Sequence, residues 1–504
     1  MRLRSTAYLA SICLVLAFSG CKSNSSADDN YSRVTGWAYN DKTGTGFAVK
    51  KNYISEIPNG MVPIEGGSYT IGEKGEFITA PRDNKPRRIT VSSFYMDQYE
   101  IRNIDWREYT NWMKVVFGKT APKLVDKAQP DVNVWREELA YNEPYLENYF
   151  ISPAYDQYPV VGVTWEQAMD YCEWRTDRVN ELSLIDAGVI AAPNFSKLDK
   201  VKSADSIAST FVFNTRKYLK QPNYLPAPGK KPMKDLWSKN RKADRSDGIL
   251  HDAYRLPTEA EWEFAAYALK ADKNGIVPEG RLYPWSGSQL RNPTKKELGR
   301  MQANFVRGRG DMMGTSGRLN DRATITAPVS WYGANDFGLY NMAGNVNEWV
   351  LDVYRATTYN DISEYNSFRG NEYKTPLVGS KDSIGNNIFK LDSLGRLKTE
   401  TFKGDDVRSY KDGDPMSQLD FDIADTLGLA NLKSKKFDPS DILRPKITDK
   451  TRVYKGGSWK DRIYWLNPST RRYLDQDKST NDIGFRCAMS MIGNIQQIPQ
   501  NKRK

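Results

Sequence analysis

The stretch that decides the fold of this chain is Gly338-Leu339-Tyr340-Asn341-Met342-Ala343-Gly344-Asn345-Val346-Asn347-Glu348-Trp349. Its glycines and asparagines are turn formers, and apolar residues stand between them. This pattern is typical of a domain in which turns and short strands surround aromatic side chains. We expect Trp349 to lie in the core, together with tryptophans from similar stretches: Trp262, Trp285 and Trp459.

The stretches on either side predict regular elements. Strands are predicted around residues 61–69, with a glycine turn between two of them, and over residues 93–97. Helices are predicted over residues 103–116, over residues 165–174 and after Pro257. Thr164 is the expected N-cap of the second helix, and the Glu that follows it is the expected partner in a capping box.

Two long polar stretches interrupt the pattern, at about residues 181–253 and about residues 355–450. The first is Lys-rich and weakly periodic, and the second is charged and rich in turn formers. We interpret both as insertions on the surface of one domain that covers residues 60–490, with a basic tail at 491–504. Solvated decoration and a surface for partner proteins are equally compatible with such insertions.

The N-terminus has the layout of a bacterial lipoprotein signal. Arg2 and Arg4 precede an apolar run over residues 7–18, and small residues lead to Cys21. An ordinary secretory signal or a membrane helix is the alternative, but the run has only about 12 residues against about 20 for a span. We expect a signal peptide at 1–20, diacylation of Cys21, and a tether and N-terminal extension at 21–59.

The remaining composition limits the function. No later stretch has the length and hydrophobicity of a membrane helix, so lipid on Cys21 is the expected membrane contact. The formal net charge of +11 is spread over the whole chain, and no concentrated Arg/Lys stretch carries stacking aromatics, which argues against nucleic acid. The charge is a weak indication of an acidic partner protein.

Cysteine and histidine are scarce. After removal of Cys13 with the signal and acylation of Cys21, Cys172 and Cys487 remain, and an oxidising compartment favours one disulfide. The single histidine, His251, excludes His-rich zinc or iron sites. We expect it to be a solvated loop residue.

Taken in order, the motifs resemble those of the formylglycine-generating (sulfatase-modifying factor) family. The matching stretches are residues 94–97, 159–165, 171–174, 255–263, 283–285, 338–349, 456–459 and 484–487. The resemblance covers roughly residues 60 to 490 apart from the two insertions. It implies an α+β fold of the C-type-lectin-like kind with little regular secondary structure.

The resemblance fails at the positions that matter for chemistry. Enzymes of this family bind copper with two cysteines, at the third and eighth positions after the Ser of the Gly-Gly-Ser motif. Counting from Ser458 gives Asp461 and Leu466. A carboxylate and an aliphatic side chain cannot make a soft copper(I) site. We therefore expect no catalytic residue. An enzyme or maturation factor with an altered active site is the alternative, and a lectin-like carbohydrate binder follows from fold analogy alone.

Within the family, the lipoprotein signal, the early stretch at residues 32–37 and the two insertions resemble the non-catalytic lipoproteins of gliding motility and type IX secretion. This resemblance implies a lipid-anchored protein at the periplasmic face of the outer membrane. Its implied partners are other lipoproteins and ring components of that machinery.

The family resemblance also implies a disulfide between Cys172 and Cys487 and two structural calcium sites. The first calcium site would use the Asn304 and Asp321 side chains with the carbonyls of Phe305 and Ala323. The second would use the Asn341 and Glu348 side chains with the carbonyls of Gly344 and Val346. Such oxygen ligands suit calcium, and the second site is the stronger match because Asn341 to Glu348 keeps the family's spacing without gaps. The alternative is that Asn and Glu at these positions cap turns.

Overall fold

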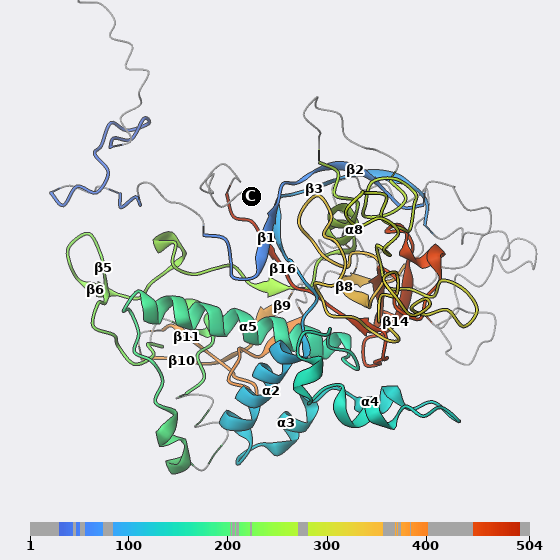
Figure 1. The fold of residues 1–504 in the computed structure, drawn as a ribbon. Coiled ribbons are helices and arrows are strands. Elements are labelled where there is room, and N and C mark those ends of the chain that lie inside the picture. The colour runs from blue at the N-terminus through green and yellow to red at the C-terminus, as the bar shows by residue number, and fades with distance from the viewer. Residues whose placement is uncertain are drawn as a thin grey trace, which may run out of the picture.

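The computed structural model describes residues 30–43, 47–50, 56–73, 84–201, 203, 207, 211–221, 224–270, 281–355, 368, 370, 374–383, 385–401 and 447–493 (Figure 1). The expected signal peptide, Cys21 and most of the basic tail lie outside these residues. Within them, no helix is both long and apolar enough to cross a lipid bilayer. The arrangement is α+β, as the sequence predicts.

One four-stranded sheet joins the beginning and the end of the domain. Its strand order is β1, β4, β16, β7, all antiparallel. The strands are β1 (Met61–Ile64), β4 (Phe94–Asp97), β16 (Ala488–Ser490) and β7 (Tyr254–Arg255). Ala488 in β16 is paired with Met96 on one side and with Arg255 on the other. The last strand among the described residues therefore lies inside the sheet and closes the domain.

The second four-stranded sheet carries the motif residues. Its order is β14, β13, β8, β15, with β15 parallel to β8 and the other pairs antiparallel. The strands are β8 (Asn347–Val353), β13 (Thr451–Lys455), β14 (Arg472–Asp475) and β15 (Ile483–Gly484). This sheet places the end of the residue 338–349 stretch beside the turn that follows β13.

Two long helices, α2 (Asn103–Phe117) and α5 (Trp165–Asp186), lie beside these sheets (Figure 1). Thr164 caps α5 as expected, but Gln167, and not Glu166, completes the capping box: its Oε1 accepts the Thr164 amide N–H at 2.9 Å. The reason is position, since Gln167 is the third helical residue. The helix after Pro257 is α8 (Glu259–Tyr267), with a box between Thr258 and Glu261.

The remaining elements in the described part of the chain are short. The other α-helices are α3 (Pro122–Lys127), α4 (Glu143–Asn148) and α7 (Thr215–Lys220). The 3-10 helices, labelled η, are η1 (Val132–Trp135), η2 (Pro153–Tyr155), η3 (Phe195–Lys200), η4 (Arg245–Asp247) and η8 (Ile463–Leu466). The other strands are β2 (Gly67–Ile71), β3 (Arg87–Val91), β5 (Met233–Lys234), β6 (Asn240–Arg241), β9 (Lys374–Pro376), β10 (Val378–Lys381), β11 (Asn387–Phe389) and β12 (Thr399–Thr401).

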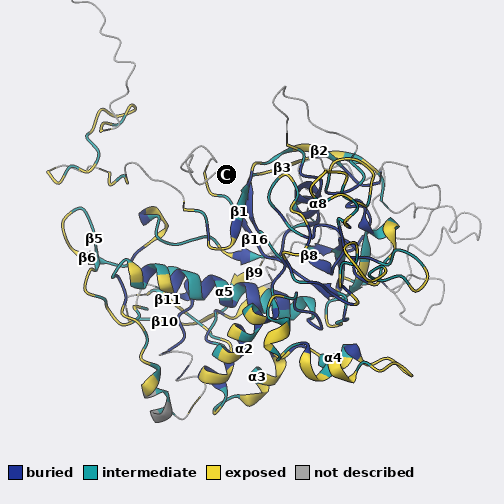
Figure 2. Cartoon of the chain, in the orientation of Figure 1, coloured by how far each residue is buried: buried dark blue, intermediate teal, exposed yellow. Residues whose placement is uncertain are grey.

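The core is built from aromatic and aliphatic side chains, and buried residues are concentrated in the sheets and on parts of the long helices (Figure 2). Trp262, Trp349 and Trp459 are buried, as predicted. Trp285 is only partly buried: it stacks on Tyr283 and donates to the Gln289 carbonyl at the edge of a smaller cluster. The prediction of a core position is therefore wrong for Trp285.

The first insertion has a core of its own. Helix α5 continues past residue 181 to Asp186, and the chain then folds back to form a buried cluster of Leu184, Val189, Ile190, Phe213, Tyr218 and Ala243. Asp177 of α5 accepts the Thr215 amide at 2.8 Å and the Asn214 side-chain amide at 2.9 Å. This segment is thus packed against the domain and is more than a solvated surface loop.

The described part of the second insertion forms two small antiparallel pairs, β9 with β12 and β10 with β11. It is fastened to α5 by Arg396, whose Nη1 lies 2.8 Å from Asp170 Oδ1 and 3.2 Å from Glu173 Oε2. Arg216 of the first insertion lies 3.9 Å from Glu173 as well. Both insertions therefore meet the same helix.

Candidate functional site

The turn after β13 leads to Asp461, the first of the two positions at which the sequence resemblance implies a copper-binding cysteine in the enzymes. Gly456 and Gly457 have φ of 103° and 70°, a backbone conformation that side chains rarely allow. A Cβ atom at Gly457 would lie 2.7 Å from the Trp465 carbonyl oxygen. The amide of Trp459 donates to the Asn345 carbonyl at 2.9 Å, which joins this turn to the residue 338–349 stretch.

Asp461 is held at this turn by hydrogen bonds and by one arginine. Its Oδ2 accepts the Ser458 amide at 2.8 Å and the Ser458 hydroxyl at 2.7 Å. Arg472 of β14 binds both carboxylate oxygens, with Nη1 at 2.7 Å and Nη2 at 2.5 Å. The paired, fork-like geometry is the strong form of a guanidinium and carboxylate contact.

Arg472 itself is enclosed. Its guanidinium lies over the rings of Tyr454 and Trp465, 5.0 and 4.4 Å from their centroids, and its Nη2 also donates to Asn347 Oδ1. Burial lowers the pKa of Arg472, but the hydrogen bonds and charge of Asp461 outweigh it and raise the pKa above its ordinary value. The arginine therefore stays charged and holds the carboxylate in place.

Leu466 lies at the other expected cysteine position. It is fully buried at the end of η8 and packs in an apolar cluster with Tyr283, Met301 and Phe305. An ion-paired carboxylate and a buried aliphatic side chain thus occupy the two positions. These groups offer no thiolate to a soft metal ion and no redox-active atom.

His251 is not the solvated loop residue that the sequence predicts. It is half-buried on a cavity of about 290 Å³, together with Tyr95, Ser183, Asp186 and other residues. Burial lowers the pKa of His251. The Ser183 hydroxyl donates to the Val179 carbonyl instead of to this histidine, so the cavity does not place a serine and a histidine in a catalytic hydrogen bond.

Cys172 and Cys487 lie side by side, although 315 residues separate them in the sequence. Their Sγ atoms are 3.5 Å apart, both are buried, and both are free thiols in this structure. Burial and the neighbouring thiol raise the pKa of Cys487 well above its ordinary value. The structure thus brings the predicted pair together without the bond, and the disulfide stays a prediction.

The residues of the second predicted calcium site are buried, but its carboxylate already has partners. Glu348 accepts two hydrogen bonds from the fully buried Arg486, at 2.6 and 2.7 Å, and one from Trp262 Nε1 at 2.8 Å. The Asn341 amide nitrogen donates to Glu100 Oε2 and to the Val329 carbonyl. A calcium ion here would have to share Glu348 with an arginine.

The first predicted calcium site has the same feature. Asp321 forms an ion pair with Arg307 and accepts the Tyr332 hydroxyl at 3.1 Å. The side-chain amide of Asn304 donates to the Ile325 carbonyl at 2.8 Å. Phe305 and Ala323, the expected carbonyl donors, are both buried. Both predicted sites pair their carboxylate with an arginine in this arrangement, and calcium binding stays a prediction.

The sequence reasoning missed Arg472 and Glu100. Glu100 is fully enclosed and accepts the side-chain amides of Asn341 and Asn345 at 3.0 and 2.9 Å. Burial raises the pKa of Glu100 to about 7, although the charge of Arg486 acts in the opposite direction. Neither residue has a sequence signal of its own, because each becomes important only through a partner distant in the chain or across a strand pair.

The sequence is similar to proteins of a known family. The pattern of the sulfatase-modifying factor enzyme 1-like domain matches residues 48–491. The formylglycine-generating enzyme of Thermomonospora curvata is 41% identical over 327 residues, which cover 62% of this chain and 77% of that enzyme. The formylglycine-generating enzyme of Mus musculus is 26% identical over 304 residues, which cover 60% of each chain. The inactive C-alpha-formylglycine-generating enzyme 2 of Bos taurus is 24% identical over 324 residues, covering 60% of this chain and 74% of that protein.

Proposed function

Because this chain belongs to the family of sulfatase-modifying factor enzyme 1-like domains, we propose that it keeps the family scaffold without the oxidase chemistry and acts as a structural lipoprotein. One observation carries the proposal. Asp461 is paired with Arg472, and Leu466 is buried. These two residues occupy the positions at which the sequence resemblance implies the copper-binding cysteines of the family's enzymes. A relative of this chain that is itself described as inactive supports the idea that the scaffold serves without its chemistry.

The finer proposal is a role in the type IX secretion and gliding motility machinery. The lipoprotein signal, the stretch at residues 32–37 and the two insertions resemble the lipoprotein GldJ and its sister GldK, also called PorK. The choice of GldJ over GldK rests mainly on the stretch at residues 32–37. The proposed partners are other lipoproteins and ring components of that machinery. The packed first insertion supports this role, because an insertion with its own core can present a fixed surface.

The proposed location is the periplasmic face of the outer membrane, with Cys21 carrying the lipid. Lys22, and not Asp, follows the anchor, which argues against retention at the inner membrane. No acidic cluster comes directly after the anchor, which argues against export to the cell surface. Labelling cells with a fatty-acid probe tests the anchor. Label should appear on the native chain and be absent from a Cys21→Ala chain.

Oxygen consumption tests the loss of chemistry. Purified chain, loaded with copper(I) and given a cysteine-containing peptide, should consume no more oxygen than copper with the peptide alone. The enzyme of Thermomonospora curvata is the positive control. Copper-dependent turnover by the native chain that exceeds this background would replace our proposal with that of an enzyme with an altered site.

Crosslinking in native membranes tests the structural role. Crosslinks to other envelope proteins should start from exposed positions of the first insertion, such as Trp237, which has 60% of its surface exposed. A chain that crosslinks to no other protein in membranes would contradict a scaffold function.

A further inference from the structure

The described residues between 30 and 50 expose large apolar side chains. Val34 has 93% of its surface exposed, Phe47 has 72%, Trp37 has 57% and Tyr31 has 52%. A soluble domain exposes single apolar residues commonly, but four within so short a segment form a concentration that needs an explanation.

Local contacts give this segment a definite shape. Tyr31 and Ala38 form an antiparallel bridge, and the Ser32 amide donates to the Trp37 carbonyl at 2.8 Å. Asn40, in the middle of the segment, is joined to its C-terminal end, because its side chain accepts the Val49 amide at 2.8 Å and donates to the Val49 carbonyl at 3.0 Å. The apolar side chains are therefore exposed on a folded segment.

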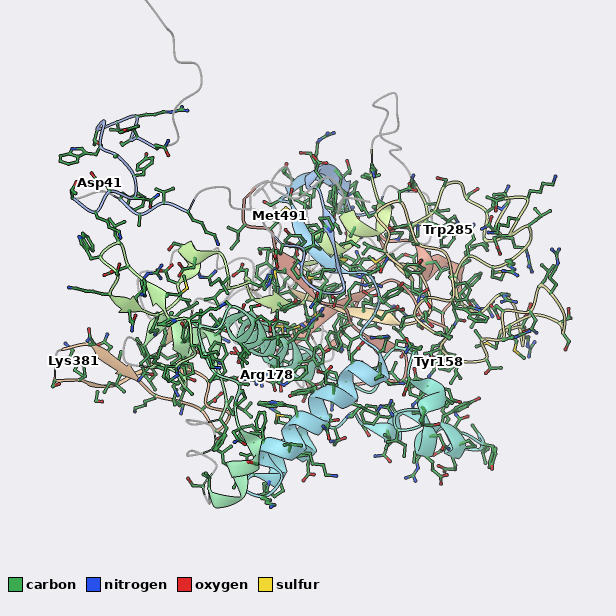
Figure 3. The ribbon with its side chains drawn as sticks, turned by 60° about the vertical axis from the view of Figure 1, so that its left-hand side comes forward. Asp41, Tyr158, Arg178, Trp285, Lys381 and Met491 are labelled. Carbon is green, nitrogen blue, oxygen red and sulfur yellow. The ribbon has the colours of Figure 1, made fainter. Side chains whose placement is uncertain are left out.

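The segment stands apart from the body of the domain (Figure 1), and the labelled Asp41 lies at the edge of the molecule, far from Tyr158 and Trp285 (Figure 3). Its contact with the body includes a hydrogen bond from Lys50 Nζ to the Asp247 carbonyl of the first insertion. The domain core therefore does not cover the exposed side chains.

The distance along the chain indicates what does cover them. Asn30 follows Cys21 by nine residues, which reach at most about 32 Å when fully extended. A lipid on Cys21 would keep this segment within that distance of the bilayer. Trp and Tyr favour the membrane and water interface. The segment also carries the exposed cations Arg33 and Lys42, and cations near a bilayer are attracted to anionic headgroups.

We infer that the described residues 30–43 and 47–50 form a second, non-covalent membrane contact, in which Val34, Trp37 and Phe47 insert at the lipid interface. The inference rests on the proposed lipid anchor. Two acyl chains on Cys21 would already suffice to hold the protein at the membrane, so the segment would serve to orient the domain above the bilayer. The contact of Lys50 would transmit that orientation to the first insertion.

Vesicle binding by the unlipidated chain tests the inference. The full mature chain with Cys21→Ser is mixed with vesicles of phosphatidylethanolamine and phosphatidylglycerol, and the bound fraction is measured by flotation. We expect binding, and we expect Val34→Ser combined with Trp37→Ser to lower the partition coefficient at least about tenfold, as the lost apolar burial requires. Vesicles of phosphatidylcholine alone should bind more weakly.

Trp237→Ser is the matched control, since Trp237 is exposed to a similar extent but lies in the first insertion. It should bind vesicles like the unsubstituted chain. All variants should melt at the same temperature, because the substituted residues lie outside the core. Absent binding by the unsubstituted chain, or equal binding by the double variant, would overturn the inference and point to a protein that covers this segment.

Failure of the anchor proposal gives a different result. Native chain without fatty-acid label would contradict the anchor even if the unlipidated chain bound vesicles. If the native chain carries the fatty-acid label but its unlipidated form does not bind vesicles, the anchor proposal holds and only the second membrane contact is overturned.

Discussion

Replacing Asp461 by alanine separates a structural role of this residue from a chemical one. The change removes a carboxylate that accepts two hydrogen bonds from Ser458 and two from Arg472. Only 11% of the Asp461 side chain and 20% of the Arg472 side chain are exposed. Arg472 would therefore remain largely enclosed with a positive charge and without its main partner.

The expected cost follows from these contacts. Breaking a buried ion pair by removing one partner costs about 3–5 kcal/mol, because the remaining charge stays desolvated. The exposed fifth of Arg472 and its remaining bond to Asn347 reduce that penalty. We expect Asp461→Ala to lower the free energy of unfolding by about 2–4 kcal/mol.

A second variant distinguishes the two roles. Arg472→Met in the Asp461→Ala background removes the stranded charge while it keeps an apolar side chain beside Tyr454 and Trp465. The double variant should cost less than the sum of the two single variants, with a coupling of about 1 kcal/mol or more in urea unfolding. Secretion and motility should follow protein abundance in all three strains.

Two outcomes would refute this reasoning. Additive costs would mean that Asp461 and Arg472 do not depend on each other. A double variant that accumulates like the native protein but loses secretion would indicate that the site performs chemistry, and the proposal of a structural lipoprotein would then fall.

Three further predictions concern the core. Cys172 and Cys487 should form a disulfide in the exported protein, so thiol titration of the unfolded, unreduced chain should find neither, and two reactive thiols would contradict the pairing. Calcium, unlike magnesium, should raise the melting temperature, and Asn341→Ala should reduce this shift. Glu348→Ala is unsuitable as a test of calcium binding, because it leaves the buried Arg486 without its carboxylate partner. A calcium-dependent rise in the melting temperature of the native chain requires binding at only one of the two sites, so no rise would contradict both. Burial raises the pKa of Glu100 from 4.5 to about 7, so the unfolded chain loses this proton at lower pH than the folded chain. The free energy of unfolding should therefore fall as pH rises from about 4.5 to about 7, by up to about 3 kcal/mol, and Glu100→Gln should flatten this slope.

The sequence predicts the elements that depend on local signals. The capped helices α5 and α8 and the strands β1 and β4 form where residue spacing and turn residues indicate. Trp262 and Trp349 are fully buried, as the stretches that contain them predict. These features need no knowledge of distant partners.

The features that the sequence misses depend on contacts between distant residues. Glu100 meets Asn345 across 245 residues, so its burial becomes visible only once the domain is closed. Arg472 reaches Asp461 because of the register in which β13 and β14 pair. A shift of this register by one residue would turn the Arg472 side chain to the other face of the sheet. The first insertion looks solvated because its few apolar residues have no clear period, yet they gather into one cluster.

The packing of both insertions on α5 changes how partner binding has to be tested. Arg396 from the second insertion and Arg216 from the first both approach Glu173, and Asp177 is buried beneath α7 with its pKa raised by burial to about 6. Deleting residues 181–253 would remove the last residues of α5 and leave Asp177 without its partners Asn214 and Thr215, so a loss of secretion could then follow from misfolding alone. Substitutions at exposed positions of the insertion, such as Trp237 and Leu225, leave that cluster intact. Such substitutions distinguish a docking surface from a folding requirement, and deletion does not.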